Sequence, residues 1–209
     1  MERTACATIL LLFGASAAAQ NWSVEAYVGD AFNLRTRLQV TQEGGFSRAV
    51  TADYETRGFE TPLYYMLRVA RWQDTRAWEG ALIHHKVYLR NPPDGISDLS
   101  ISHGFNMVVL NRAARAGDWT YRIGAGPVIT HAEATINGVR YDGPYRLSGA
   151  ALLAGGGRRF NLGKSVFASA EVMASIGYAR PKLEGTPSAR IEASNVALHA
   201  VLGLGFDIR

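Results

Sequence analysis

The sequence has a single cysteine, Cys6, and few long hydrophobic runs. Because Cys6 lies close to the N-terminus, a chain that loses its first residues needs no disulfide. Beyond residue 20, the longest stretch without a charged residue, 193–206, is shorter than the roughly 18 residues of a transmembrane helix. The formal net charge is only +4, and the absence of a basic run argues against nucleic acid as a partner.

The N-terminus has the pattern of a secretory signal peptide. Met1-Glu2-Arg3 precedes an apolar run that ends in the small residues 15–19, and Ala17 and Ala19 predict cleavage after Ala19. Residues 1–19 are then the signal peptide, and residues 20–209 form one exported domain.

Alternating apolar and polar residues predict strands rather than helices in this domain. The 22 glycines, about a tenth of the chain, also favour a β-rich protein. We expect eight strands, at Trp22–Gly29, Leu63–Trp72, Ala77–Arg90, Ser100–Ala114, Trp119–Ile136, Tyr145–Phe160, Val166–Tyr178 and Ile191–Ile208. Tight turns alternate with longer loops at 30–61, 91–99, 137–144 and 179–190, although the first of these contains two weakly alternating pieces that could form a hairpin. This alternation is typical of small outer-membrane barrels.

The aromatic residues fit the same architecture. Trp22, Trp72, Trp78 and Trp119 all lie at the turn ends of their strands, where they would form one interfacial girdle. A second girdle is expected at the loop ends, from Tyr64, Tyr65, Tyr88, Tyr145 and Tyr178. In the last strand, apolar residues from Val196 to Ile208 share one face, which predicts a lipid-facing surface. The fold class is therefore all-β, an eight-stranded antiparallel transmembrane β-barrel in the bacterial outer membrane.

Histidines gather in the loop-side halves of neighbouring strands. If the fourth and fifth strands turn about Gly117, His103 lies opposite His131, and Glu133 points the same way. Two imidazoles and a carboxylate can hold a divalent transition metal and leave positions open for a substrate. By alternation these residues continue the lipid-side face of Trp119, Tyr121, Ile123 and Phe105. The alternative is an interfacial histidine pair without a metal, and a bulge at Pro127 would turn His131 and Glu133 inward.

Polar residues on the opposite face are expected to line the lumen. They are His84, Lys86, Arg90, Asn106, Arg122, Glu171 and His199. Charges inside a narrow barrel must pair, so Arg122 and Glu171 are interpreted as a structural ion pair. Lys86 and Arg90, nearer the mouth, could instead bind an anionic sugar phosphate.

Several motifs resemble the small outer-membrane barrels known as lipid A oxidases. They are His84-His85-Lys86-Val87-Tyr88, Ser102-His103-Gly104-Phe105-Asn106, His131-Ala132-Glu133 and Glu171, together with Tyr64-Tyr65 after Pro62. The resemblance extends over residues 64–178. It implies oxygen-dependent oxidation of the proximal glucosamine of lipid A to an aminogluconate unit at the outer leaflet.

The positions that match the family are His84, His103, His131, Glu133 and Glu171, and the residues themselves suggest the following roles as a hypothesis. His84, His103 and Glu171 are candidate catalytic residues, although Glu171 is also expected to order the lumen. A divalent transition metal would be held by His103, His131 and Glu133, and the lipopolysaccharide would be bound by Lys86, Arg90 and Asn106. We expect a monomer. The alternative function is a non-enzymatic barrel that strengthens the membrane or mediates adhesion.

Overall fold

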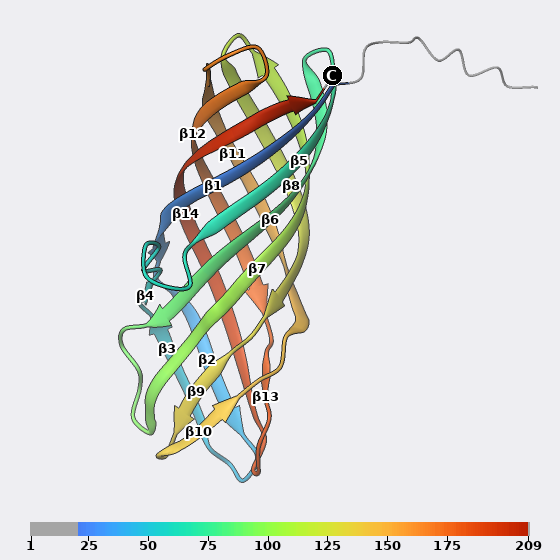
Figure 1. Ribbon diagram of the computed structural model, residues 1–209. Coiled ribbons are helices and arrows are strands. Elements are labelled where there is room, and N and C mark those ends of the chain that lie inside the picture. Colours follow the sequence, from blue (N-terminus) through green and yellow to red (C-terminus); the bar gives the residue numbers. More distant parts are fainter. Residues whose placement is uncertain (1–20, 209) are drawn as a thin grey trace, which may run out of the picture.

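The computed structural model describes residues 21–208, apart from the side chains of Ser102 and His103, and the predicted signal peptide lies outside this range. The strands are β1 (Asn21–Leu34), β2 (Thr36–Gln42), β3 (Ser47–Ala52), β4 (Tyr54–Glu55), β5 (Tyr65–Gln73), β6 (Arg76–Leu89), β7 (Ile96–Ala116), β8 (Trp119–Thr130), β9 (Glu133–Ile136), β10 (Val139–Asp142), β11 (Arg146–Asn161), β12 (Val166–Ala179), β13 (Lys182–Leu183) and β14 (Ala189–Ile208) (Figure 1). Among these residues, no helix is long and apolar enough to cross a membrane.

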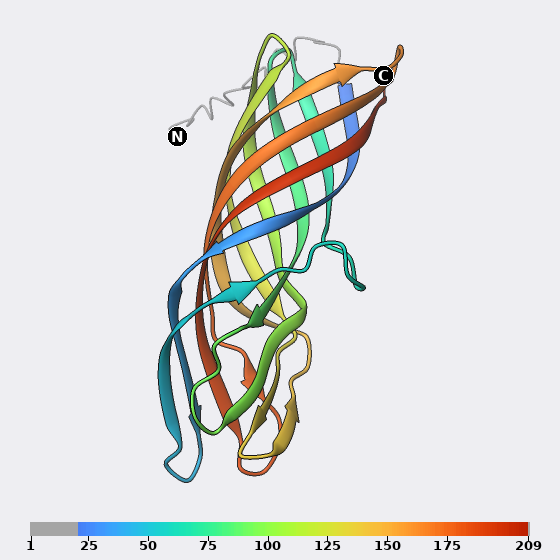
Figure 2. The same cartoon turned by 90° about the vertical axis from the view of Figure 1, so that its left-hand side faces the viewer.

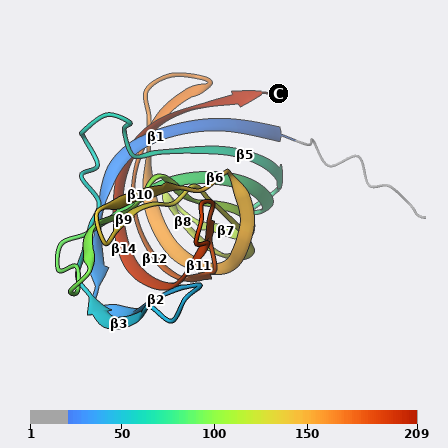
Figure 3. The same cartoon turned by 90° about the horizontal axis from the view of Figure 1, so that it is seen from below.

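Eight strands pair antiparallel in a closed ring. The order is β1, β5, β6, β7, β8, β11, β12 and β14, and β14 pairs again with β1. Tyr27 at the middle of β1, for example, lies opposite Met66 on one side and Gly203 on the other. Figure 3 shows the ring along its axis. The predicted antiparallel all-β class with eight strands is confirmed.

Alternation along each strand gives the ring a polar inside and an apolar outside. In β1, Ser23, Glu25 and Tyr27 are buried in the lumen, whereas Val24 and Val28 are exposed on the outer face. The predicted outward row of β14 is confirmed, because alternate residues from Leu198 to Ile208 are exposed and Val196 at its start is half-buried. The outer face thus carries an apolar belt around the ring.

The aromatic girdles are only partly as predicted. Trp22, Trp78 and Trp119 are exposed on the outer face, but Trp72 is buried in the lumen, where its Nε1–H donates to Ser23 Oγ at 3.2 Å. Trp72 immediately follows the outward Arg71, and neighbours in a strand point to opposite faces. For the same reason Tyr64 is buried, whereas its neighbour Tyr65 is partly exposed.

The two ends of the barrel differ in construction. At the end with the predicted tight turns, called here the turn end, strands are joined by residues 74–75, 117–118 and 162–165. At the opposite end, called the loop end, paired strands extend beyond the ring (Figures 1 and 2). Segment 30–61, expected as a loop, is mostly strand, because β1 continues to Leu34 and β2 pairs with β3 in the hairpin its alternating pieces suggested.

The register of β7 and β8 corrects another expectation. Phe105 lies opposite Thr130 and Ala116 opposite Trp119, so the turn contains only Gly117 and Asp118 and the predicted register is wrong by one residue. Phe105 is buried inside the barrel rather than facing outward. The β7–β8 register also passes Pro127 without a shift, and register shifts occur instead on β11, between Leu147 and Gly149, and on β7 between Ser100 and Phe105, where its partner changes from β9 to β8.

Candidate functional site

The lumen is crossed by a network of buried charges centred on Glu171 from β12. Arg68 Nη1 and Nη2 donate to the two Glu171 carboxylate oxygens at 2.8 and 2.9 Å, and Arg122 Nη1 donates to Glu171 Oε2 at 2.7 Å. Arg68 also pairs with Glu25 at 3.0 Å, and Arg122 with Glu79 at 3.0 Å. The expected Arg122–Glu171 pair is therefore present within a larger network, in which buried charges satisfy one another.

Sequence reasoning missed Glu25, Arg68 and Glu79. The available signal was their spacing, because each stands at an inward position between outward apolar residues of β1, β5 or β6. The glycines of β11 make room for the network. A Cβ built on Gly157 would collide with the side chain of Glu171, so a side chain at this position would displace the carboxylate that both arginines bind.

A second, uncharged network fills the lumen nearer the loop end. His199 of β14 contacts Ser175 Oγ through Nε2 at 2.8 Å and the Tyr64 hydroxyl through Nδ1 at 3.0 Å. His85 Nε2 lies 3.1 Å from Thr56 Oγ1, and the rings of His85 and His199 meet edge to face. Ser175 and His199 resemble part of a hydrolase triad, but a phenol occupies the place of the acid and both residues are buried. This network positions side chains inside the barrel.

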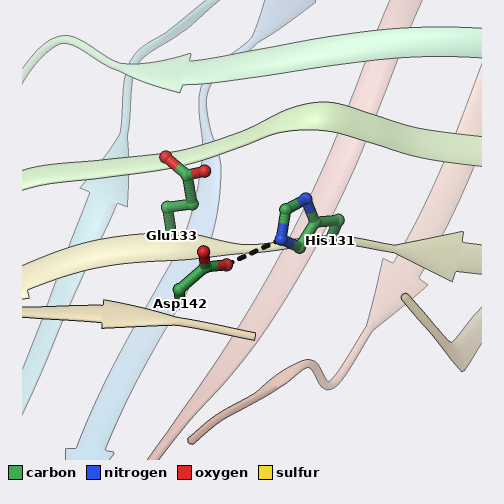
Figure 4. Close-up of side chains that lie close together, drawn as sticks. All are labelled: His131, Glu133 and Asp142. Atoms are coloured by element: carbon green, nitrogen blue, oxygen red, sulfur yellow. Dashed lines mark hydrogen bonds and ion pairs between the residues drawn. The ribbon is translucent and has the colours of Figure 1, made fainter. Parts of the chain in front are cut away.

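A different cluster lies on the outer face at the loop end. His131 follows β8, Glu133 begins β9 and Asp142 ends β10, and the three side chains project to one side of the β9–β10 hairpin (Figure 4). His131 Nε2 lies 2.7 Å from Asp142 Oδ1. One ligand atom from each residue lies within 4.8 Å of the others. Their inward neighbours Ala132 and Ala134 are buried, which confirms the predicted outward direction of His131 and Glu133.

The hairpin brings two carboxylates into direct opposition. Asn137 and Gly138 both have positive φ, which a two-residue turn requires, and this register places Glu133 opposite Asp142. Like charges directly opposite each other in a sheet are unfavourable. The described cations beside them are Arg140, whose Nη2 lies 3.2 Å from Glu133 Oε2, and His131 when it is protonated.

This donor set fits a divalent metal ion. Imidazole nitrogen suits zinc, iron and copper, and carboxylate oxygen suits manganese and magnesium, so one histidine with two carboxylates suits a first-row transition metal. The side chains of His131 and Glu133 are 15% and 16% exposed and that of Asp142 is 61% exposed, so an ion could approach from outside. His131 and Glu133 belong to the predicted triad, Asp142 was missed, and the side chain of His103 lies outside the described residues.

His84 and Asn106 point to the outer side of their strands instead of into the predicted lumen. On that side His84 is buried at 6% exposure and Asn106 is half-buried. His84 Nδ1 lies 2.7 Å from Asn106 Oδ1, and Tyr65 stacks on the His84 ring with 4.8 Å between ring centroids. Their position follows from alternation, because residues an even number apart in a strand point to the same face. His84 lies six residues after the exposed Trp78, and Asn106 lies two residues before the exposed Val108. His84 lies on β6 and Asn106 on β7, and β7 pairs with β8 and β9 next to His131.

Lys86 and Arg90, the predicted phosphate ligands, have different environments. Lys86 stands at a register shift between His85 and Val87, and its Nζ donates to the carbonyl of Glu60 at 2.7 Å. The segment that follows β4 therefore holds the Lys86 ammonium group. Arg90 is exposed just beyond β6. Of the two, only Arg90 is accessible to a phosphate group without a rearrangement.

The comparisons with known proteins concern the architecture. No protein-family model matches the chain, and no curated protein sequence matches it. The crystal structure of the outer membrane protein OprG from Pseudomonas aeruginosa is similar, with a TM-score of 0.55 and 12% identity over 92% of this chain and 97% of OprG. The solid-state NMR structure of the outer membrane protein AlkL in DMPC bilayers has a TM-score of 0.58 and 11% identity over 100% of this chain and 97% of AlkL. This chain therefore has the fold of small outer-membrane β-barrel proteins.

Proposed function

We propose that the chain is a bacterial outer-membrane barrel that modifies lipid A at the outer leaflet. The apolar belt, the outward tryptophans at the turn end and the similarity in fold to OprG and AlkL support a membrane location. In barrels of this kind, short turns face the periplasm and longer loops face outward. The loop end would then lie at the outer surface, beside lipopolysaccharide.

The observation that carries the enzymatic proposal is the outward cluster of His131, Glu133 and Asp142 at the loop end. A membrane lipid can reach groups on the lipid-facing side directly, whereas side chains fill the lumen of a narrow barrel. The resemblance of the histidine motifs to lipid A oxidases supports the same reaction, the oxygen-dependent oxidation of the proximal glucosamine.

Individual residues have distinct roles in this proposal. His131, Glu133 and Asp142 would hold the metal, which would supply the capacity to activate oxygen. His84, buried beneath Tyr65, would position Asn106 beside a sugar hydroxyl, and Arg90 would bind a phosphate group. Glu171 would maintain the barrel shape through Arg68 and Arg122, 2.7–2.9 Å away, rather than contact the substrate.

The test is the mass spectrum of lipid A from cells that otherwise make it unmodified. Wild type should add one oxygen to lipid A only in air. Asp142→Asn, which keeps the side-chain shape, should abolish this product, and Glu192→Gln, a carboxylate change on β14, should retain it. An unchanged spectrum with correctly inserted wild type would contradict the enzymatic proposal and favour a non-enzymatic barrel. Loss of an acyl chain or phosphate would contradict the oxidation.

A further inference from the structure

Tryptophan and arginine alternate in one row across the outer face at the turn end. Trp22, Arg71, Trp78 and Arg112 lie directly opposite one another on β1, β5, β6 and β7. The Arg71 guanidinium lies 6.0 Å from the centroid of the Trp22 ring, and that of Arg112 lies 5.1 Å from the Trp78 ring. Arg76 is exposed one outward position nearer the turn. The arginines therefore stand at the level of the outward tryptophans.

These arginines have no acidic partner among the residues that the structure describes. None of the described ion pairs involves Arg71, Arg76 or Arg112. Other surface arginines do pair, and at the same end Arg158 on β11 lies 3.5 Å from Asp118. Uncompensated positive charge is thus concentrated over β5–β7.

A groove beside the row combines this charge with apolar surface. Arg76, Arg112, Tyr121 and Ile123 line a space of about 470 Å³, and Ala114 stands between Arg76 and Tyr121 in the strand register. The methyl group of Ala114 leaves the groove open between larger neighbours. Two guanidinium groups can donate to phosphate oxygens, while the Tyr121 ring and the Ile123 side chain can contact an acyl chain.

We propose that this groove binds an anionic phospholipid of the periplasmic leaflet, with its phosphate between Arg76 and Arg112. The proposal rests on the membrane location proposed above but not on the enzymatic activity at the opposite end. The occupant is a lipid rather than a free anion because the two guanidinium groups adjoin lipid-facing apolar side chains. A tryptophan on the same face places the site at the depth of headgroups.

The test measures lipid binding by the folded full-length protein in uncharged detergent micelles. Brominated phosphatidylglycerol quenches nearby tryptophans, and brominated phosphatidylcholine is the zwitterionic comparison. Wild type should be half-quenched at a lower mole fraction of phosphatidylglycerol than of phosphatidylcholine. The double variant Arg76→Gln/Arg112→Gln should need about 25-fold more phosphatidylglycerol, since each arginine near a membrane surface strengthens anionic lipid binding about fivefold.

A charge-matched double variant, Arg35→Gln/Arg146→Gln, removes two paired arginines elsewhere and should bind phosphatidylglycerol like wild type. Three results would overturn the proposal: equal quenching by the two lipids, the same loss in the charge-matched variant, or displacement of phosphatidylglycerol by millimolar inorganic phosphate. Heat-dependent gel migration verifies that each protein is folded. A wild type that cannot enter micelles would contradict the membrane location itself, whereas folded wild type without a lipid preference would contradict only this inference.

Discussion

Carboxylates occur in two contrasting settings in this barrel. In the lumen, both oxygens of Glu171 accept hydrogen bonds from Arg68 and Arg122, and the side chain is 3% exposed. On the outer face, Glu133 and Asp142 oppose each other across a hairpin and remain accessible beside His131. Acidic side chains alone therefore do not mark a site. The lumen carboxylate is neutralised by buried cations, whereas the outer pair, in which Glu133 contacts the exposed Arg140, lies where an ion or substrate can reach it.

The largest expected effect concerns the lumen. Arg68→Met removes the cation shared by Glu25 and Glu171 and leaves buried carboxylates undercompensated. We expect the free energy of unfolding to fall by about 3–5 kcal/mol, as found when one partner of a buried ion pair is lost. Urea unfolding in micelles, followed by tryptophan fluorescence, measures it. Unchanged stability would show that the network is not structural, which would remove the contrast between the two settings.

A smaller loss is expected from Gly157→Ala. Its new methyl group would collide with the side chain of Glu171 and push the carboxylate away from its arginines. Overpacking of this kind costs about 1–3 kcal/mol. Gly80→Ala is the matched control, because a Cβ at Gly80 meets no atom within 4 Å. Equal unfolding midpoints for the two variants would contradict the assigned packing around Glu171.

The smallest expected effect concerns the tryptophans. Trp72→Phe removes the hydrogen bond to Ser23 Oγ and leaves that buried hydroxyl with one partner fewer, so we expect a loss of about 1 kcal/mol. Trp78→Phe, on the exposed outer face, should change the unfolding free energy less. A larger effect from Trp78 would contradict the inward placement of Trp72.

Much of the fold could be predicted because a barrel strand repeats a period of two. The inward row of Ser23, Glu25 and Tyr27 and the outward row of β14 follow from alternation alone. The predictions were wrong where the inward or outward direction of residues in one strand was inferred from a neighbouring strand. The register of β7 and β8 depends on whether the turn holds two or three residues, and this difference reverses the inferred face of Phe105 and Asn106.

The outer cluster was predictable only in part. Asp142 lies in a segment expected to be a loop, yet Asn137-Gly138 is a strong signal for a two-residue hairpin, and counting outward from it pairs Glu133 with Asp142. Alternation marks Arg68 as inward-facing, but no local signal identifies its partners. Its partners lie on strands distant in sequence, so their meeting depends on barrel closure and on the relative stagger of the strands.

The most direct test of the difference between the lumen and outer carboxylates is a calorimetric titration of folded, metal-free protein with Zn²⁺. We predict one site that is weakened more than about tenfold by Asp142→Asn, because even lost outer-shell partners cost 10–100-fold in metal affinity. Glu192→Gln, which removes a carboxylate on β14, should bind Zn²⁺ like wild type. Equal affinity in wild type and Asp142→Asn would contradict the account, because the outer carboxylates would then be no more a ligand site than those of the lumen.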